Sequence, residues 1–319
     1  MGIQTLKLGL RSGLLTTWIL GKVIFPVTLI VTLLSFTPVI DWVIYLCEPF
    51  MKWIGLPGEA AIPLVLANLL NLYAGIGAIL TLDLTVKEVF ILAVMMSFSH
   101  NLLIETAVSS KVGIKAWVVF AVRIGLALAS ALAIHYIWQG GGDTAQYGLV
   151  TPANKEEITG LFSILLYGME KAVMGIVQLA LIVIPLMIFI QWMKDIQLLQ
   201  YFTRWMTPIT RLLGLSPNTA TTLGAGLIFG LAYGAGVIIQ AIKEDNIKKK
   251  DIYLVFIFLV ACHAVIEDTL IFIPLGIPIW PLLAFRLVTA ILLTMAVAFV
   301  WNRIEKEKNR AQEGVIHEL

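Results

Sequence analysis

Long apolar stretches separated by short polar turns run along almost the whole chain and predict helices that cross a membrane. In the first half they occupy 13–36, 39–56, 59–82, 87–109 and 115–138. In the second half they occupy 163–193, 196–213, 218–241, 252–273 and 281–301. A helix needs about 20 apolar residues to cross the hydrocarbon layer, and most of these stretches reach that length. The pattern predicts an all-α integral membrane protein with about ten helical membrane segments.

The second stretch of each half fits this pattern less well. The stretch 39–56 is short and contains Asp41, Glu48 and Lys52, whereas 196–213 contains two arginines. Each is either an amphipathic helix in the membrane surface or a crossing helix that packs against protein. The sequence leaves both alternatives open.

Composition supports a membrane protein and excludes other classes. Of the 319 residues, 59% are hydrophobic and 13% are charged, whereas soluble domains average about 45–50% apolar and about 25% charged residues. The net charge of +2 comes with no basic binding motif, so no nucleic-acid partner is expected. Cys47 and Cys262 are too few for a disulfide framework or a spaced metal motif. The first apolar stretch lacks a small-residue cleavage site and is long enough to span, so we expect a retained helix rather than a signal peptide.

The second half of the chain repeats the first. The segment "SHNLLIETAVSSKVGIKAW" (99–117) aligns without a gap with "CHAVIEDTLIFIPLGIPIW" (262–280), at an offset of 163. This alignment pairs His100 with His263, Glu105 with Asp268, Gly113 with Gly276 and Arg123 with Arg286. Upstream, an offset of 159 pairs Pro26 with Pro185, Gly55 with Gly214, Gly75 with Gly234 and Gly77 with Gly236. The sequence therefore predicts two repeats, 1–155 and 156–319.

The charges of corresponding loops suggest that the two repeats have opposite orientations. In the second half the loop 243–251 is rich in lysine and the turn 274–281 has no charge. In the first half the turn 109–115 carries Lys111 and Lys115, and the connector 139–160 is mainly acidic. Positive loops stay in the cytoplasm, so corresponding loops lie on opposite sides of the membrane. This predicts inverted-topology repeats of five helices each, with both termini cytoplasmic.

Glycines and asparagines interrupt the third apolar stretch of each half. Asn68 and Asn71 lie three residues apart, which gives them one helix face and a common partner, and Gly75 and Gly77 follow. The second half has Gly234 and Gly236 at the matching places. Such glycines either break the helix so that backbone groups face a substrate, or allow neighbouring helices to pack closely. Both interpretations stay open from the sequence.

An acid and an arginine occur at matching depths of the fourth and fifth stretches. Glu105 precedes Arg123 by 18 residues across a turn at Gly113, and Asp268 precedes Arg286 by the same separation. With a rise of about 1.5 Å per residue, the members of each pair lie at similar distances from the turn. We expect two structural ion pairs, with a role for the acids in substrate or proton binding as the alternative.

Two histidines and one further acid lie within the fourth stretches. His100 and His263 each precede the paired acid by five residues, which on a continuous helix directs them to a different neighbour. His263 and Glu267 are four residues apart on one face, and Glu267 has no counterpart because Ile104 takes its place. These two form a local hydrogen bond, a proton relay or part of a metal site, or the histidines are simply satisfied buried residues. If both histidines meet between the halves, they make a substrate or ion site.

The segments "NLYAGIGAIL", "GLAYGAGVII", "SHNLLIET" and "CHAVIEDT" resemble the nucleoside-recognition or Gate-domain membrane proteins. This family includes the Gate modules of ferrous-iron permeases, spore-maturation membrane proteins and regions of concentrative nucleoside transporters. The resemblance implies one Gate module in each half and a transporter-like fold. The chain lacks the GTPase domain of the iron permeases.

The leading functional hypothesis is a secondary, gradient-driven transporter for a small polar solute, such as a nucleoside-like one, with its site between the repeats. The expected site residues are Asn68, Asn71, Gly75, Gly77, His100, Gly234, Gly236, His263 and Glu267. The alternatives are a divalent metal-ion permease that uses His100, His263 and Glu267, and a membrane scaffold that transports nothing. No catalytic motif or nucleotide-binding domain is recognised, so we expect neither an enzyme nor a cofactor. Coupling to a proton or sodium gradient and assembly into a homo-oligomer in the cell membrane are compatible with this hypothesis.

Overall fold

The computed structural model describes residues 2–34, 36–147, 160–196 and 198–317, and these residues form an all-helical protein. The first half contains α1 (Ile3–Leu34), α2 (Pro38–Trp53), α3 (Ala61–Leu69), α4 (Leu72–Ile79), α5 (Val86–Ser99), α6 (Leu102–Lys111) and α7 (Ala116–Ile137). The second half contains α8 (Leu161–Asp195), α9 (Leu198–Leu212), α10 (Ala220–Glu244), α11 (Lys249–Ala261), α12 (Glu267–Leu270) and α13 (Ile279–His317). Short 3-10 turns lie at Gly58–Ala60, Pro217–Thr219 and Ile273–Leu275. The predicted boundary between the halves, at 155/156, falls outside the described residues.

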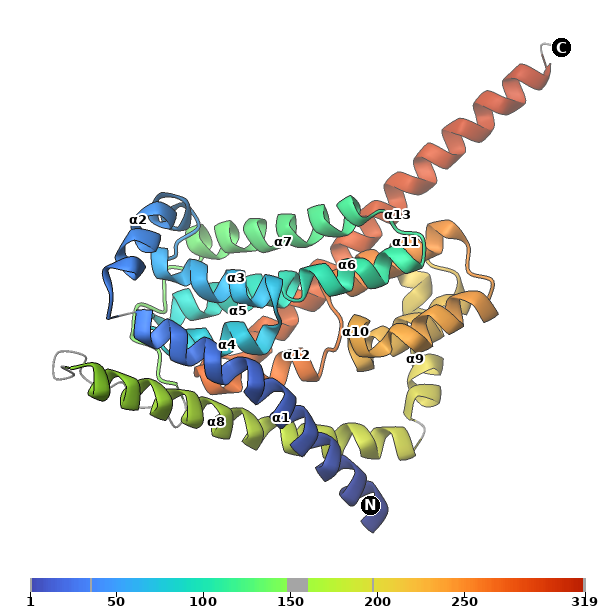
Figure 1. Cartoon of the computed structure of the whole chain (residues 1–319). Coiled ribbons are helices and arrows are strands. Elements are labelled where there is room, and N and C mark those ends of the chain that lie inside the picture. The colour runs from blue at the N-terminus through green and yellow to red at the C-terminus, as the bar shows by residue number, and fades with distance from the viewer. Residues whose placement is uncertain (1, 35, 148–159, 197, 318–319) are drawn as a thin grey trace.

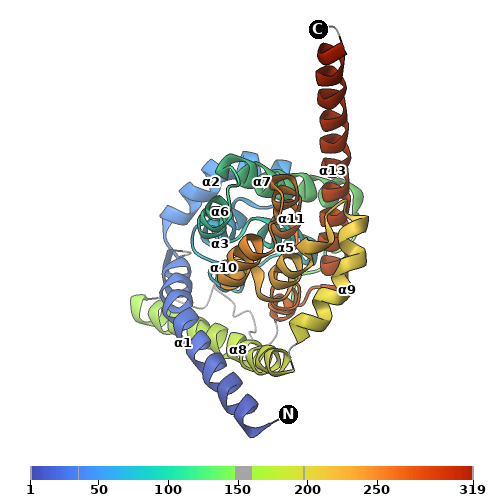
Figure 2. The same ribbon diagram turned by 90° about the vertical axis from the view of Figure 1, so that its right-hand side faces the viewer.

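A group of shorter helices forms the body of the molecule, and two long helices pack along one side of it. Figure 1 shows α1 and α8 side by side and antiparallel beneath this body. Helix α13 begins inside the body and projects far beyond it toward the C-terminus, as both Figure 1 and Figure 2 show. The core therefore lies among α3 to α7, α10 and α11, and the site described below lies within it.

Five described helical segments are long and apolar enough to cross a membrane, by length and composition. They are Ile3–Leu34, Val86–Lys111, Ala116–Ile137, Leu161–Met193 and Ile279–Lys308. A sixth candidate is the pair Ile44–Trp53 and Gly58–Leu69, which is bent by 91°. Several of the ten predicted stretches are therefore broken or short helices in the structure, and whether α2 and α9 cross the membrane stays a prediction.

Large apolar side chains cover the outer faces of the long helices. Trp18 is 65% exposed and Phe299 is 69% exposed, and Leu181 and Leu292 are similarly uncovered. Such surfaces are unfavourable in water but suit a hydrocarbon environment, where the helices already satisfy their own backbone groups. The outer faces of α1, α8 and α13 therefore match a lipid bilayer.

The third and fourth stretches are interrupted at equivalent positions in both halves. The break between α3 and α4 lies at Leu70–Asn71, and the equivalent of Asn71 is Gly230, which has non-helical angles (φ 73°, ψ 179°) inside α10. The breaks at Asn101 (φ 50°) and Ala264 (φ 41°) also correspond. The turn glycines repeat in the same way: φ is 78° and 75° at Gly55 and Gly214, and 90° and 67° at Gly113 and Gly276. The duplication therefore extends to the backbone conformation.

The paired glycines do not break their helices, so the first of the two interpretations left open by the sequence is wrong. Gly75 and Gly77 lie inside α4, and Gly234 and Gly236 lie inside α10, in both cases C-terminal to the observed break. Each break instead precedes its glycine pair by several residues. The glycines thus belong to the short helices that begin at the breaks.

The two halves contact each other reciprocally through α1 and α8. A Cβ added to Gly9 would lie 2.5 Å from Ile188 Cα, and one added to Gly168 would lie 2.9 Å from Leu29 Cδ1. At the offset of 159, Gly9 corresponds to Gly168 and Leu29 to Ile188. Each contact is therefore the counterpart of the other, as at a two-fold interface in which one patch meets its own equivalent.

Candidate functional site

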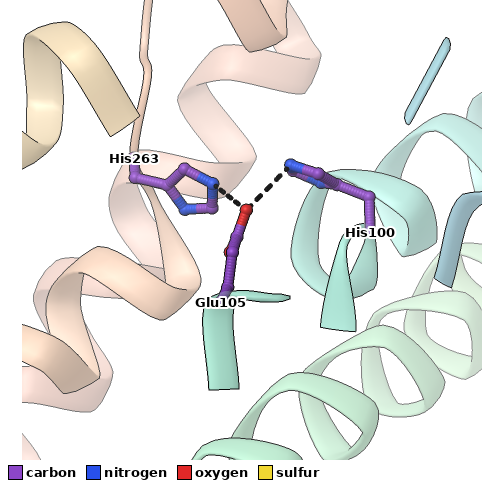
Figure 3. Close-up of side chains that lie close together, drawn as sticks. All are labelled: His100, Glu105 and His263. Atoms are coloured by element: carbon purple, nitrogen blue, oxygen red, sulfur yellow. Dashed lines mark ion pairs between the residues drawn. The ribbon is translucent and has the colours of Figure 1, made fainter. Parts of the chain in front are cut away.

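Two histidines and two acids, one of each from either half, meet at the breaks of the fourth stretches. Figure 3 shows His100 and His263 directed at Glu105 from opposite sides. Asp268 lies beside the same histidines. A cavity of about 300 Å³ opens onto this cluster. Its polar lining includes Asn71, Tyr73, His100, Asn101, Glu105, His263, Glu267 and Asp268.

The crossing helices satisfy the backbone groups that the breaks set free. The amide of Asn101 donates to Ala67 O at 2.9 Å, and the amide of Ala264 donates to Gly226 O at 3.1 Å. Buried backbone groups need such partners, especially where water is scarce. The third stretch of each half therefore holds the break of the fourth in place.

The expected ion pairs Glu105–Arg123 and Asp268–Arg286 are confirmed. Arg123 Nη1 pairs with Glu105, and Arg286 Nη2 lies 3.1 Å from Asp268 Oδ2. Each arginine also donates from Nη2 to the backbone carbonyl of its own histidine, at 2.5 Å for His100 and 3.0 Å for His263. Both guanidinium groups are fully buried. Each arginine thus neutralises an acid and holds the carbonyl group at a break.

The two halves differ in how completely the arginine is bonded. Arg123 Nε donates to Phe98 O at 2.7 Å, whereas Arg286 Nε is buried without a partner. Arg286 Nη1 also has only a long contact with Thr269, at 3.4 Å. The hairpin of the second half is therefore held less tightly than that of the first.

The structure brings the two histidines together, as a shared site between the halves requires. Their ring centroids lie 5.3 Å apart. Glu105 Oε1 lies 3.5 Å from His100 Nε2 and 3.1 Å from His263 Nε2. Asp268 Oδ2 lies 3.9 Å and 3.6 Å from the same two nitrogens. The sequence raised the meeting of the two histidines but not their contacts with the acids. It treated the fourth stretch as one helix, on which a spacing of five residues directs histidine and acid to different neighbours.

Glu267 does not share a helix face with His263, contrary to the expectation. Helix α12 begins only at Glu267, so the chain between the two residues is not helical. Glu267 Oε1 instead accepts a hydrogen bond of 2.6 Å from the hydroxyl group of Tyr73, in the other half. Tyr73 lines the cavity and was missed by the sequence analysis, although its position two residues after Asn71 was a usable signal.

The two predicted asparagines have separate roles rather than a common partner. Asn71 Oδ1 accepts from the amide of Ala74 at 2.9 Å, so it caps the start of α4, and it lines the cavity. Asn68 Nδ2 donates to Leu64 O at 2.7 Å within α3. Asn71 is therefore positioned at the site, whereas Asn68 belongs to the helix before the break.

The predicted glycines are packing positions to different degrees. A Cβ added to Gly75 would lie 2.7 Å from Ala67 Cβ and 2.8 Å from Met96 Sδ, so α3, α4 and α5 approach closely there. One added to Gly236 would meet no atom within 4 Å. In the second half it is Gly230, at the break, that lines the cavity.

The comparisons with known proteins place these features in a family. The model of the Gate family, described as "Nucleoside recognition", matches residues 17–127 and 176–278, which is one region in each half. The chain therefore belongs to the Gate family of membrane proteins, and the resemblance inferred from its sequence is confirmed. It is 60% identical over 295 residues to the uncharacterized membrane protein YvoD of Bacillus subtilis (strain 168), which covers 92% of this chain and 94% of YvoD. No solved structure matches the chain. It is a multi-pass protein embedded in the lipid bilayer.

Proposed function

We propose that this protein is a secondary permease that carries a small polar solute or ion through the cavity between its two halves. The observation that supports this most directly is the convergence of His100, Glu105, His263 and Asp268 on one cavity. All four side chains are buried, and each half supplies two of them. Ionisable groups inside a membrane are costly and usually mark the path of a substrate or ion.

The proposal includes inverted repeats of five helices, 1–155 and 156–319, with both termini in the cytoplasm. The equivalent helices α1 and α8 pack antiparallel, so an approximate two-fold axis perpendicular to them relates the halves. If both helices cross the membrane, that axis lies in the membrane plane. Corresponding loops of the two halves differ in charge, which also supports an inverted arrangement of the halves in the membrane. Transporters with inverted repeats bind substrate between the repeats, at interrupted helices.

The size and lining of the cavity suit one small ligand. Its volume of about 300 Å³ is at the lower end of the usual range for ligand pockets, about 300–1,000 Å³. Acceptors and a tyrosine hydroxyl group line one part, whereas Ile19, Leu70 and Phe229 line another. This combination suits a polar solute with an apolar face, including a nucleoside-like one. A membrane scaffold without transport would not need a polar cavity, and we propose neither that role nor an enzymatic one.

Uptake into proteoliposomes tests the proposal. The full chain is reconstituted and given nucleosides, amino acids and divalent cations, each with a proton or sodium gradient across the membrane. We expect uptake of at least one of them, and a large loss in His263→Ala and Glu267→Gln. Arg303→Gln, on the exposed part of α13, is the control that keeps uptake. Equal flux in protein-free liposomes for every solute and gradient would contradict the proposal.

A further inference from the structure

We infer that His100, His263, Glu105 and Asp268 form a binding site for a divalent transition-metal ion such as Zn²⁺. The site combines two imidazole nitrogens with two carboxylate oxygens, half of them from each repeat. This inference deepens the proposed function and rests on it for the role of the cavity, since it names the class of ion that binds there. The binding itself is measurable without any transport.

Three of the candidate ligand atoms, from His100, Glu105 and His263, lie close enough together to share one metal ion. Metal–ligand bonds of about 2.0–2.1 Å place neighbouring tetrahedral ligands about 3.3 Å apart. Glu105 Oε1 lies 3.5 Å from His100 Nε2 and 3.1 Å from His263 Nε2, and these three atoms lie within 4.8 Å of one another. Asp268 Oδ2 lies 3.6 Å from His263 Nε2 and 3.9 Å from His100 Nε2, which makes it the candidate for a fourth ligand.

The backbone orients both imidazole rings with Nε2 toward the acids, and the neutral form of each ring can then bind a metal. His100 Nδ1 lies 2.8 Å from Met96 O, and His263 Nδ1 lies 2.7 Å from Leu259 O. A carbonyl oxygen only accepts, so each Nδ1 must carry the hydrogen and each neutral ring keeps its lone pair on Nε2. A hydrogen bond from the other ring nitrogen to a carbonyl group is the usual support of a metal-binding histidine.

The same arrangement leaves two acceptors facing each other unless a cation lies between them. The Nε2 lone pair of His263 is directed at Glu105 Oε1, which is also an acceptor when ionised. A metal ion or a proton removes this repulsion. One imidazole and one carboxylate are enough to share a proton. The site has two imidazoles, with ring centroids 5.3 Å apart, and two carboxylates, and such nitrogen and oxygen ligands suit a transition metal. Mg²⁺ and Ca²⁺ prefer oxygen ligands and fit less well.

The surrounding arginines orient the two carboxylates of the site. Arg123 pairs with Glu105 through Oε2, which leaves Oε1 free to face the histidines. Arg286 pairs with Asp268 through Oδ2, the oxygen that also faces the histidines, so Asp268 is the weaker ligand. The two arginines thus hold one carboxylate from each half beside the histidines.

Titration of the purified protein with Co²⁺ tests the inference. The full chain in detergent is stripped with a chelator, and Co²⁺ is added while the visible absorption is recorded. We expect the intense absorption bands of four-coordinate Co²⁺ at one equivalent, and their loss when Zn²⁺ is added. Mg²⁺ should displace neither ion. The absence of these bands, with only a weak six-coordinate spectrum, would overturn the inference and leave a proton as the occupant.

Variants locate the site. His100→Ala and His263→Ala should each weaken binding by at least about 100-fold, the upper limit seen when second-shell partners of metal sites are removed. His135→Ala, outside the cluster, should bind like the unchanged protein. Gel filtration and thermal unfolding show that each variant is folded, and His263→Gln replaces His263→Ala if that variant is not. Unchanged binding in both histidine variants would refute the site.

Two assays separate this inference from the permease proposal. Uptake of a solute by a protein that binds no Co²⁺ or Zn²⁺ would overturn the inference and leave the permease proposal standing. Metal binding that depends on the two histidines, without flux of any solute or ion, would support the inference and contradict the permease proposal.

Discussion

At the scale of single residues, Arg123 performs two tasks at one point of the backbone. It pairs with Glu105 and also holds the carbonyl group of His100, which the break leaves without a helical partner. A buried carboxylate that has lost its arginine still bears the free-energy cost of removal from water, without the ion pair that offset this cost. The stability of the site and its geometry therefore depend on the same side chain.

We expect Arg123→Met to destabilise the protein by about 3–5 kcal/mol, the usual cost of removing one partner of a buried pair. Thermal or denaturant unfolding in detergent measures this. Arg303→Met is the matched control, because its pair with Glu307 is exposed and contributes little. The double variant Arg123→Met/Glu105→Gln should regain part of the loss, since no unpaired charge stays buried. A double variant less stable than Arg123→Met would argue against this explanation.

At the scale of helices, the breaks in the third and fourth stretches determine where the side chains of the site lie. Gly230 has φ 73° and ψ 179°, a backbone region that essentially only glycine adopts, and it lies against the break of the neighbouring segment. A Cβ there would lie 3.1 Å from Ala264 Cβ and 3.5 Å from His263 Cδ2. The two breaks of the second half are therefore packed against each other at the site.

We expect Gly230→Ala to disturb the site and abolish uptake, with a loss of stability of about 1–3 kcal/mol from backbone strain. Gly236→Ala in the same helix is the control, because an added Cβ meets nothing within 4 Å and alanine favours a helix. Uptake and thermal unfolding are measured for both. Normal uptake by Gly230→Ala would show that the break does not position His263.

A second prediction at this scale concerns the close packing of α4. Gly75→Ala should lower the unfolding temperature clearly, because the added Cβ would lie 2.7 Å from Ala67 Cβ and 2.9 Å from Pro63 O. Gly125→Ala, in α7 and open to its surroundings, should leave it unchanged or slightly higher. If both variants unfold alike, close packing does not explain Gly75.

The sequence predicted the helical class, the duplication and the two acid–arginine pairs, because these depend on apolar length and on spacing alone. It could not predict the helix breaks. Ala264 has φ 41° although alanine rarely adopts that conformation, and hydrogen bonds from Ala264 and Val265 to the neighbouring segment help to hold it there. The cluster of His100, Glu105 and His263 depends on those breaks. The sequence named both histidines as site residues, but it assigned Glu105 to a structural ion pair and did not name Tyr73.

At the scale of the whole molecule, the proposed inversion places equivalent turns on opposite sides of the membrane. Ser110, before the turn at Gly113, and Ile273, before the turn at Gly276, are both exposed. Their accessibility from outside the cell should therefore differ. The buried Cys262 does not interfere with thiol labelling, whereas the half-buried Cys47 has to be replaced.

In a Cys47→Ser background, we expect Ile273→Cys to react with a membrane-impermeant maleimide on intact cells. Ser110→Cys should react only after the membrane is opened, because the lysines beside it keep that turn in the cytoplasm. The Cys47→Ser parent shows the background labelling. Labelling of both cysteines from the same side would rule out the inverted arrangement.

The unequal bonding of the two arginines has a consequence for movement. If the halves are inverted repeats of a transporter, as proposed, a second state forms when they exchange conformations. Glu105 is now the acid nearer both histidines, and Arg286 is the arginine with an unpartnered Nε. In the opposite state Asp268 would move close to the histidines, Arg286 would become fully bonded and Arg123 would lose a partner. If the protein transports by such an exchange, the difference between the two arginines would be reversed in the second state.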